Sequence, residues 1–170
     1  MSEIEIRPVS GALGAEISGV DLSRDLDEST VDQLKDAFHE NLVLFFRGQD
    51  IAPGRFLEFA GYFGEVIPYP MVKGLDDYPD IVPVLKLPHE TVNFGGIRHT
   101  DTAYLEMPPM ASLLIARELP PIGGDTLWSN MYMAYETLSD GMKWMLDGMT
   151  AVNSSAKGKA AVTREDRRKT

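Results

Sequence analysis

The stretch RHTDTAYLEMPP, residues 98–109, contains a histidine and an aspartate two positions apart, His99 and Asp101. On an extended strand, residues at this spacing point to the same side. The two side chains could form a surface ion pair, a buried hydrogen-bonded pair, or two thirds of a metal site. Non-haem Fe(II) oxygenases bind their metal with two histidines and one carboxylate on one face and leave the other positions open. The residue types at this spacing therefore suit an iron site, and the rest of the chain decides between the three possibilities.

The composition is that of an acidic globular protein of one-domain length. The chain has 170 residues, and 26 Asp and Glu residues outnumber 16 Lys and Arg residues, which gives a formal net charge of −10. This balance argues against nucleic acid or an anionic membrane surface as the main partner, because both would be repelled. No cysteine is present, so disulfides, thiolate metal ligands and a cysteine nucleophile are excluded. The start of the chain lacks a signal-peptide pattern and no apolar run reaches membrane-spanning length, which predicts a cytoplasmic protein.

The elements that position the pair are predicted from apolar periodicity and turn residues. Short strands are expected at 4–10 and 15–20, and a helix is expected to start at a capping box formed by Ser29 and Asp32. This helix should give way to a buried strand at 42–46, and Pro53 should open a second helix that ends at Gly64. Further predictions are strands over 81–87, 111–118 and 125–130, followed by short helices over 131–139 and 139–149. Many short strands with helices placed early and late predict a β-rich sandwich or jelly roll with helices on one side.

Several motifs in one order give the chain a family resemblance. The segment RHTDTAYLEMPPMASLLIARELPPIGGDTLWSN, residues 98–130, resembles the taurine and 2,4-dichlorophenoxyacetate dioxygenase family of Fe(II)/2-oxoglutarate-dependent oxygenases. The similar features are the H-T-D motif, the Pro-Pro pair, the A-x-E-L-P strand and the GGDT turn. The resemblance extends upstream to GAEISGVDLS, LVLFFRGQ and FAGYFGEV, and so covers most of residues 1–150. It implies a mostly β fold with flanking helices, the double-stranded β-helix or jelly roll, incomplete in this chain.

The resemblance also implies roles for individual residues. His99 and Asp101 match the first two iron ligands, and Thr126 in GGDT matches the residue whose hydroxyl binds the 2-oxoglutarate carboxylate. The residues expected to line the substrate pocket are Asn93, Thr102, Tyr104 and Tyr69. The structural alternatives are a β-forming threonine in a strand for Thr126 and ordinary core packing for Tyr104. A third ligand, a histidine, and an arginine that binds 2-oxoglutarate lie in the C-terminal half of the family, so this chain is expected to be an N-terminal portion.

The expected function is hydroxylation of a small organic molecule, anionic substrates included, with Fe(II) as cofactor, 2-oxoglutarate as co-substrate, and release of succinate and CO2. One alternative is an inactive metal- or ligand-binding jelly-roll domain, and another is a cupin-like zinc enzyme, disfavoured because the chain has only three histidines. The remaining two histidines, His39 and His89, are expected to be structural. Residues 1–150 are expected to form the domain and the basic residues 151–170 a loop or frayed terminus. A homo-oligomer is expected, with a small-molecule substrate as the ligand.

Overall fold

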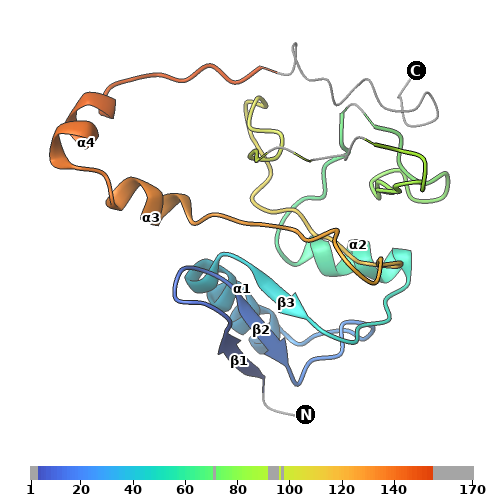
Figure 1. Cartoon of the computed structure of the whole chain (residues 1–170). Helices are drawn as coiled ribbons and strands as arrows, with labels where there is room; N and C mark the ends of the chain where they lie inside the picture. Colours follow the sequence, from blue (N-terminus) through green and yellow to red (C-terminus); the bar gives the residue numbers. More distant parts are fainter. Residues whose placement is uncertain (1–3, 71, 92–95, 97, 155–170) are drawn as a thin grey trace. The chain divides into compact units, whose positions relative to one another are not determined.

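The computed structural model describes residues 4–70, 72–91, 96 and 98–154 (Figure 1). The chain divides into two compact units, each of which is described by itself. The first consists of Met1–Ile51 and Leu114–Thr150, and the second consists of Ala52–Leu113 with the residues from Ala151 onward. The basic segment expected at 151–170 lies almost entirely outside the described residues.

The first unit is built on a three-stranded mixed sheet with the order β1-β2-β3. Strand β1 (Glu5–Pro8) pairs antiparallel with β2 (Ala15–Ser18), and β2 pairs parallel with β3 (Leu44–Phe46). Helix α1 (Glu28–Asn41) connects the two parallel strands, since parallel neighbours need a crossover rather than a tight turn. The predicted early strands and the strand after the first helix are confirmed.

Helix α1 begins two residues earlier than the capping-box prediction placed it. Asp27 is the N-cap, and its carboxylate accepts a hydrogen bond of 2.8 Å from the backbone N–H of Thr30. The prediction of a capping box at Ser29 and Asp32 is therefore wrong, because Asp27, and not Ser29, accepts the hydrogen bond from a free backbone N–H of the first turn. The helix ends at Asn41, and its C-cap Leu42 has a φ of 65°, in the left-handed region.

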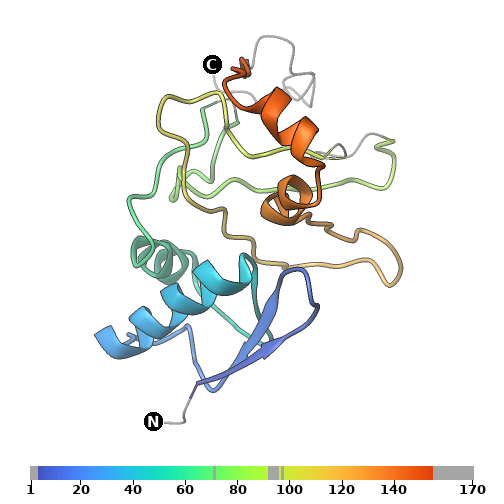
Figure 2. The same cartoon turned by 90° about the vertical axis from the view of Figure 1, so that its left-hand side faces the viewer.

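The described core of the first unit lies between α1 and the sheet, as Figures 1 and 2 show. From α1, Leu34 and Ala37 are each 1% exposed, and from β2, Ala15 and Ile17 are 0% and 2% exposed. Spacing by three on the helix and by two on the strand puts each pair on one face. Burial of these apolar side chains holds the βαβ arrangement together.

The second unit contains helix α2 (Pro53–Gly61). Pro53 occupies the first turn, as predicted. A backbone N–H at this position would have no acceptor within the helix, so proline, which lacks an N–H, loses no hydrogen bond there. The helix ends at Gly61 and not at the predicted Gly64. Phe59 is buried, and its ring contacts Phe63 edge-on at a centroid distance of 5.5 Å.

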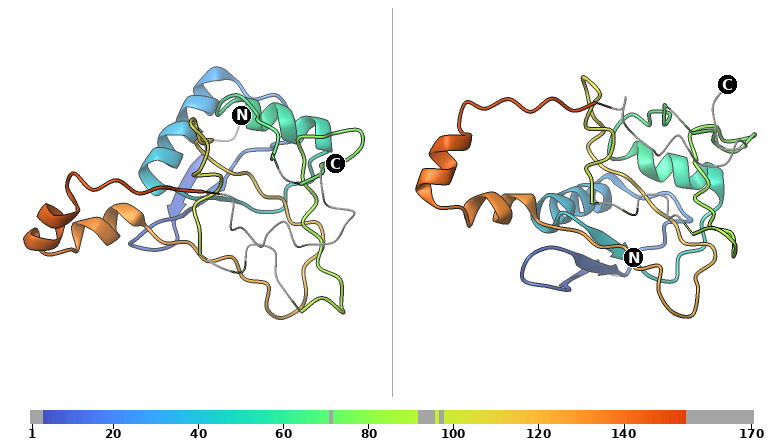
Figure 3. Two further views of the ribbon diagram at one scale, coloured as in Figure 1. Left: turned by 90° about the horizontal axis from the view of Figure 1, so that it is seen from above. Right: turned by 45° about the horizontal axis from the view of Figure 1, so that its top comes forward.

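The strands predicted over 81–87, 111–118 and 125–130 are wrong for this structure, and the described part of the sheet is smaller than the β-rich expectation. All three segments are irregular chain, which Figure 3 shows from two further sides. A strand requires a hydrogen-bonded neighbour, and its residue preferences reflect packing against that neighbour. Among the described residues, none of these three segments pairs with a strand.

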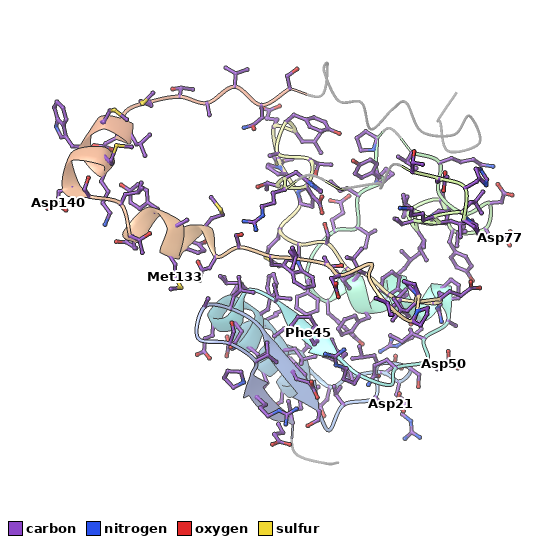
Figure 4. The ribbon with its side chains drawn as sticks, in the orientation of Figure 1. Asp21, Phe45, Asp50, Asp77, Met133 and Asp140 are labelled. Atoms are coloured by element: carbon purple, nitrogen blue, oxygen red, sulfur yellow. The ribbon has the colours of Figure 1, made fainter. Side chains whose placement is uncertain are left out.

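Two short helices follow, α3 (Met131–Glu136) and α4 (Asp140–Leu146), close to the predicted ranges. The side chains around both helices, among them the labelled Met133, are drawn in Figure 4. Several large apolar side chains here are exposed, for example Trp144 at 82% and Tyr132 at 74%. None of the helices in the described residues combines the length and apolar character needed to cross a membrane.

Candidate metal centre

The predicted ligand pair lies at the entrance to a turn in the second unit and not on a strand. Residues 98–100 are irregular chain, and a turn begins at Asp101. The backbone N–H of Leu105 donates a hydrogen bond of 2.9 Å to the carbonyl of Thr102, which closes this turn. Thr102 has a φ of 44°, in the left-handed region that non-glycine residues seldom occupy. The assumption of an extended strand is therefore corrected, although the two side chains do meet.

His99 and Asp101 approach each other through single atoms. The Nε2 atom of His99 lies 2.9 Å from Oδ1 of Asp101, and the two side chains are 53% and 47% exposed. In a facial ligand set, two atoms each about 2.1 Å from one metal ion and at right angles lie about 3.0 Å apart. The observed separation is thus compatible with both a hydrogen-bonded ion pair and two adjacent metal ligands. Neutral imidazole and ionised carboxylate suit Fe(II), so the residues present fit the group.

The other carboxylate oxygen of Asp101 has a separate partner. The hydroxyl of Ser112 donates a hydrogen bond of 2.5 Å to Oδ2 of Asp101. This length is typical of a charge-assisted bond between a hydroxyl and a carboxylate. Sequence reasoning missed Ser112, because nothing in the eleven-residue spacing from Asp101 indicates that the two side chains meet.

Two tyrosines of the same unit, Tyr69 and Tyr104, interact electrostatically in the neighbourhood of this acid. Burial raises the pKa of the Tyr69 phenol above its ordinary value of 10.0, and the nearby Tyr104 and Asp101 raise it further. The phenol therefore stays protonated at neutral pH and can donate a hydrogen bond. Asp101, Tyr104 and Tyr69 therefore lie close enough to interact electrostatically, and their roles as a ligand and two pocket residues stay a prediction.

Two of the hydroxyls in this region are buried without a hydrogen-bond partner among the described residues. They are Oγ1 of Thr102, whose residue is 7% exposed, and the hydroxyl oxygen of Tyr104. Native structures leave few buried polar atoms unpaired, because such an atom loses its bonds to water and gains nothing in return. An atom of this kind beside candidate ligands is consistent with a polar molecule that binds there.

The remaining predicted residues are not brought into this group. Thr126 is exposed and belongs to the first unit, so its shared site with His99 stays a prediction. The turn before it is confirmed: Gly123 and Gly124 have φ values of 81° and 78°, which favour glycine. Asn93 lies outside the described residues. His39 and His89 are exposed, and within the described ranges no three acidic or histidine side chains gather as a complete metal site.

Comparison with known proteins identifies the class of protein. The taurine catabolism dioxygenase TauD, TfdA family matches residues 5–170, and the chain belongs to this family.

Two characterised relatives and one solved structure illustrate the similarity. The chain is 36% identical over 154 residues to an alpha-ketoglutarate-dependent sulfate ester dioxygenase of Pseudomonas putida, which covers 90% of this chain and 50% of the relative. It is also 36% identical over 154 residues to an alkylsulfatase of Acinetobacter baylyi, covering 90% and 48%. The crystal structure of a taurine dioxygenase from Burkholderia xenovorans superposes with a TM-score of 0.74 at 36% identity, covering 85% of this chain and 51% of that one. The chain thus spans about half the length of the curated relatives it matches.

Proposed function

We propose that this chain supplies part of the active site of an Fe(II)/2-oxoglutarate-dependent dioxygenase, with His99 and Asp101 as two of the iron ligands. The observation that carries the proposal is the 2.9 Å separation between His99 Nε2 and Asp101 Oδ1 in a half-exposed position, within the family's H-T-D motif. A third ligand, a histidine, is proposed to come from outside the described residues. Thr126 is proposed to donate a hydrogen bond to the carboxylate of 2-oxoglutarate.

The ferrous ion and 2-oxoglutarate, when bound, would supply the oxidising chemistry, in which O2 and 2-oxoglutarate yield succinate and CO2 and one oxygen atom reaches the substrate. The contribution of this chain is to hold and orient. His99 and Asp101 would bind the metal, and the hydroxyls of Tyr69, Tyr104 and Thr102 would face the substrate. A buried hydroxyl that donates to an anion forms a charge-assisted bond and loses its desolvation penalty.

For the substrate, we propose a sulfate ester of a primary alcohol or a related small anion. The support is the similarity to a sulfate ester dioxygenase and to an alkylsulfatase, together with the buried hydroxyls beside Asp101. Hydroxylation of the carbon that bears the sulfate gives a hemiacetal sulfate, which collapses to an aldehyde and hydrogen sulfate. The balanced reaction is R-CH2-OSO3⁻ + O2 + 2-oxoglutarate giving R-CHO + HSO4⁻ + succinate + CO2. Asn93 is proposed to line the same pocket.

Three broader properties belong to the same proposal. The complete domain is a double-stranded β-helix, supported by the likeness to the Burkholderia xenovorans taurine dioxygenase. Residues 1–150 form its N-terminal portion and residues 151–170 a basic loop. The protein is a cytoplasmic homo-oligomer, which analytical ultracentrifugation and cell fractionation test.

The experiment adds Fe(II) and 2-oxoglutarate to the protein without oxygen and follows the visible absorption spectrum. A charge-transfer band, followed on admission of O2 and an alkyl sulfate by equal amounts of succinate, aldehyde and sulfate, supports the dioxygenase. Metal binding with no succinate supports the alternative of a ligand-binding module. If the wild-type protein shows no charge-transfer band and binds no metal, the assignment of His99 and Asp101 as iron ligands is refuted.

A further inference from the structure

The two oxygens of the Asp101 carboxylate have different neighbours. Oδ1 lies 2.9 Å from His99 Nε2, whereas Oδ2 accepts a hydrogen bond of 2.5 Å from the Ser112 hydroxyl. All three side chains belong to the second unit. One oxygen of the acid therefore faces the imidazole, and the other is held by a neutral donor.

Ser112 thereby restricts how Asp101 can bind. A free carboxylate rotates about its Cβ–Cγ bond, whose torsion is broad and roughly two-fold, and it can bind a metal through one oxygen or through both. A short bond to Oδ2 restricts this rotation and occupies one of its two lone pairs, which disfavours binding of the metal through both oxygens. What remains directed toward His99 is the single atom Oδ1.

We propose that Ser112 is a positioning residue, which fixes the Asp101 carboxylate so that Oδ1 binds the metal as a one-oxygen ligand beside His99 Nε2. This inference rests on the proposed function, because it assumes that His99 and Asp101 bind metal.

The exposure of the pair explains why such a positioning bond matters. His99 and Asp101 are 53% and 47% exposed, so protein packing covers only about half of each side chain. The Ser112 bond is the contact that ties Oδ2 to the rest of the second unit. Loss of a hydrogen bond to a ligating carboxylate typically weakens metal affinity about 10- to 100-fold.

The test compares Ser112→Thr with Ser112→Val, a pair of equal shape that differs only in the hydroxyl. The affinity of each chain for Mn(II), an oxygen-preferring stand-in for Fe(II), is measured from the electron paramagnetic resonance signal of the free ion. Ser112→Val should bind about 10- to 100-fold more weakly than wild type, and Ser112→Thr should restore the affinity. Ser112→Ala repeats the test in a smaller side chain if Ser112→Val does not fold, as judged by circular dichroism.

Asp101→Ala separates the failure of this inference from that of the proposed function. If Asp101→Ala loses Mn(II) while Ser112→Val and Ser112→Ala bind as wild type, the role of Ser112 is overturned and the ligand assignment stands. If wild type and Asp101→Ala bind Mn(II) equally, the ligand assignment is overturned and the Ser112 role falls with it. The ¹³C chemical shift of the Asp101 carboxyl in metal-free protein gives a second readout, which should move in Ser112→Val and return in Ser112→Thr.

Discussion

Replacement of Asp101 by alanine separates a metal ligand from a surface ion pair. In the structure, Oδ1 of Asp101 lies 2.9 Å from His99 Nε2, and Oδ2 accepts a hydrogen bond of 2.5 Å from the Ser112 hydroxyl. An ion pair whose side chains are about half exposed contributes at most about 1 kcal/mol, and one hydrogen bond about 0.5–1.5 kcal/mol. The free energy of unfolding without metal should therefore fall by no more than about 2.5 kcal/mol. Metal affinity, by contrast, should fall by more than the roughly 100-fold that loss of a supporting contact can cause.

The two quantities are measured on the same samples. Urea unfolding in the presence of a chelator gives the stability, and titration with Mn(II) gives the affinity. Asp76→Ala is the matched control: Asp76 is an exposed acid of the same unit, paired with Lys73 through an Nζ–Oδ1 distance of 2.6 Å. It should leave the affinity unchanged. An Asp101→Ala protein that keeps wild-type affinity, or one that loses stability as much as affinity, would contradict the interpretation of Asp101 as a ligand.

Three further predictions concern pH and local stability. Because the pKa of Tyr69 is raised, the folded state holds the phenol proton more tightly than the unfolded state, and the free energy of unfolding should fall as pH rises above about 10. Tyrosinate absorbance at 295 nm should show that one of the six tyrosines titrates later than the others, and this late group should be absent in Tyr69→Phe. Asn130→Ala removes both the N-cap of α3 and a hydrogen bond to the Ala12 carbonyl, and should lower the free energy of unfolding by about 1–2 kcal/mol, with Asn130→Asp keeping the cap. Gly14→Ala, at a φ of 94° and with a Cβ that would lie 2.8 Å from a methyl group of Val9, should cost about 1–3 kcal/mol in urea unfolding.

The sequence predicted elements whose causes are local and failed where the cause is a distant neighbour. The start of α2 at Pro53 and the glycine turn before Thr126 depend on backbone preferences of the residues themselves, and both are confirmed. The strands expected at 111–118 and 125–130 depend on a hydrogen-bonding neighbour, which no periodicity within the segment reveals. The cap of α1 failed for a finer reason, because two acceptors, Asp27 and Ser29, compete within one turn.

The candidate site shows the same division between local and distant causes. His99 and Asp101 are two positions apart, with only Thr100 between them, and their side chains meet although the backbone is irregular chain entering a turn and not the expected strand. The Ser112 contact depends on how the chain between Asp101 and Ser112 folds back, which a sequence motif does not encode. Motif reasoning therefore located the candidate ligand pair, while the contact from Ser112, proposed to orient it, required coordinates.

The difference in burial within this neighbourhood limits where further ligands can approach. The hydroxyls of Thr102 and Tyr104 are buried, whereas His99 and Asp101 keep about half of their side-chain surface exposed. If His99 and Asp101 hold a metal ion as proposed, their exposed side is where further ligands would approach it. The buried hydroxyls can donate hydrogen bonds to an anionic substrate group that loses its hydrating water on binding. Loss of the Tyr104 hydroxyl should therefore weaken binding of the organic substrate and leave the Mn(II) affinity unchanged. Loss of the Asp101 carboxylate should instead lower the Mn(II) affinity. A Tyr104→Phe protein whose affinity for Mn(II) falls as far as that of Asp101→Ala would show that the two groups act at one place and not at two.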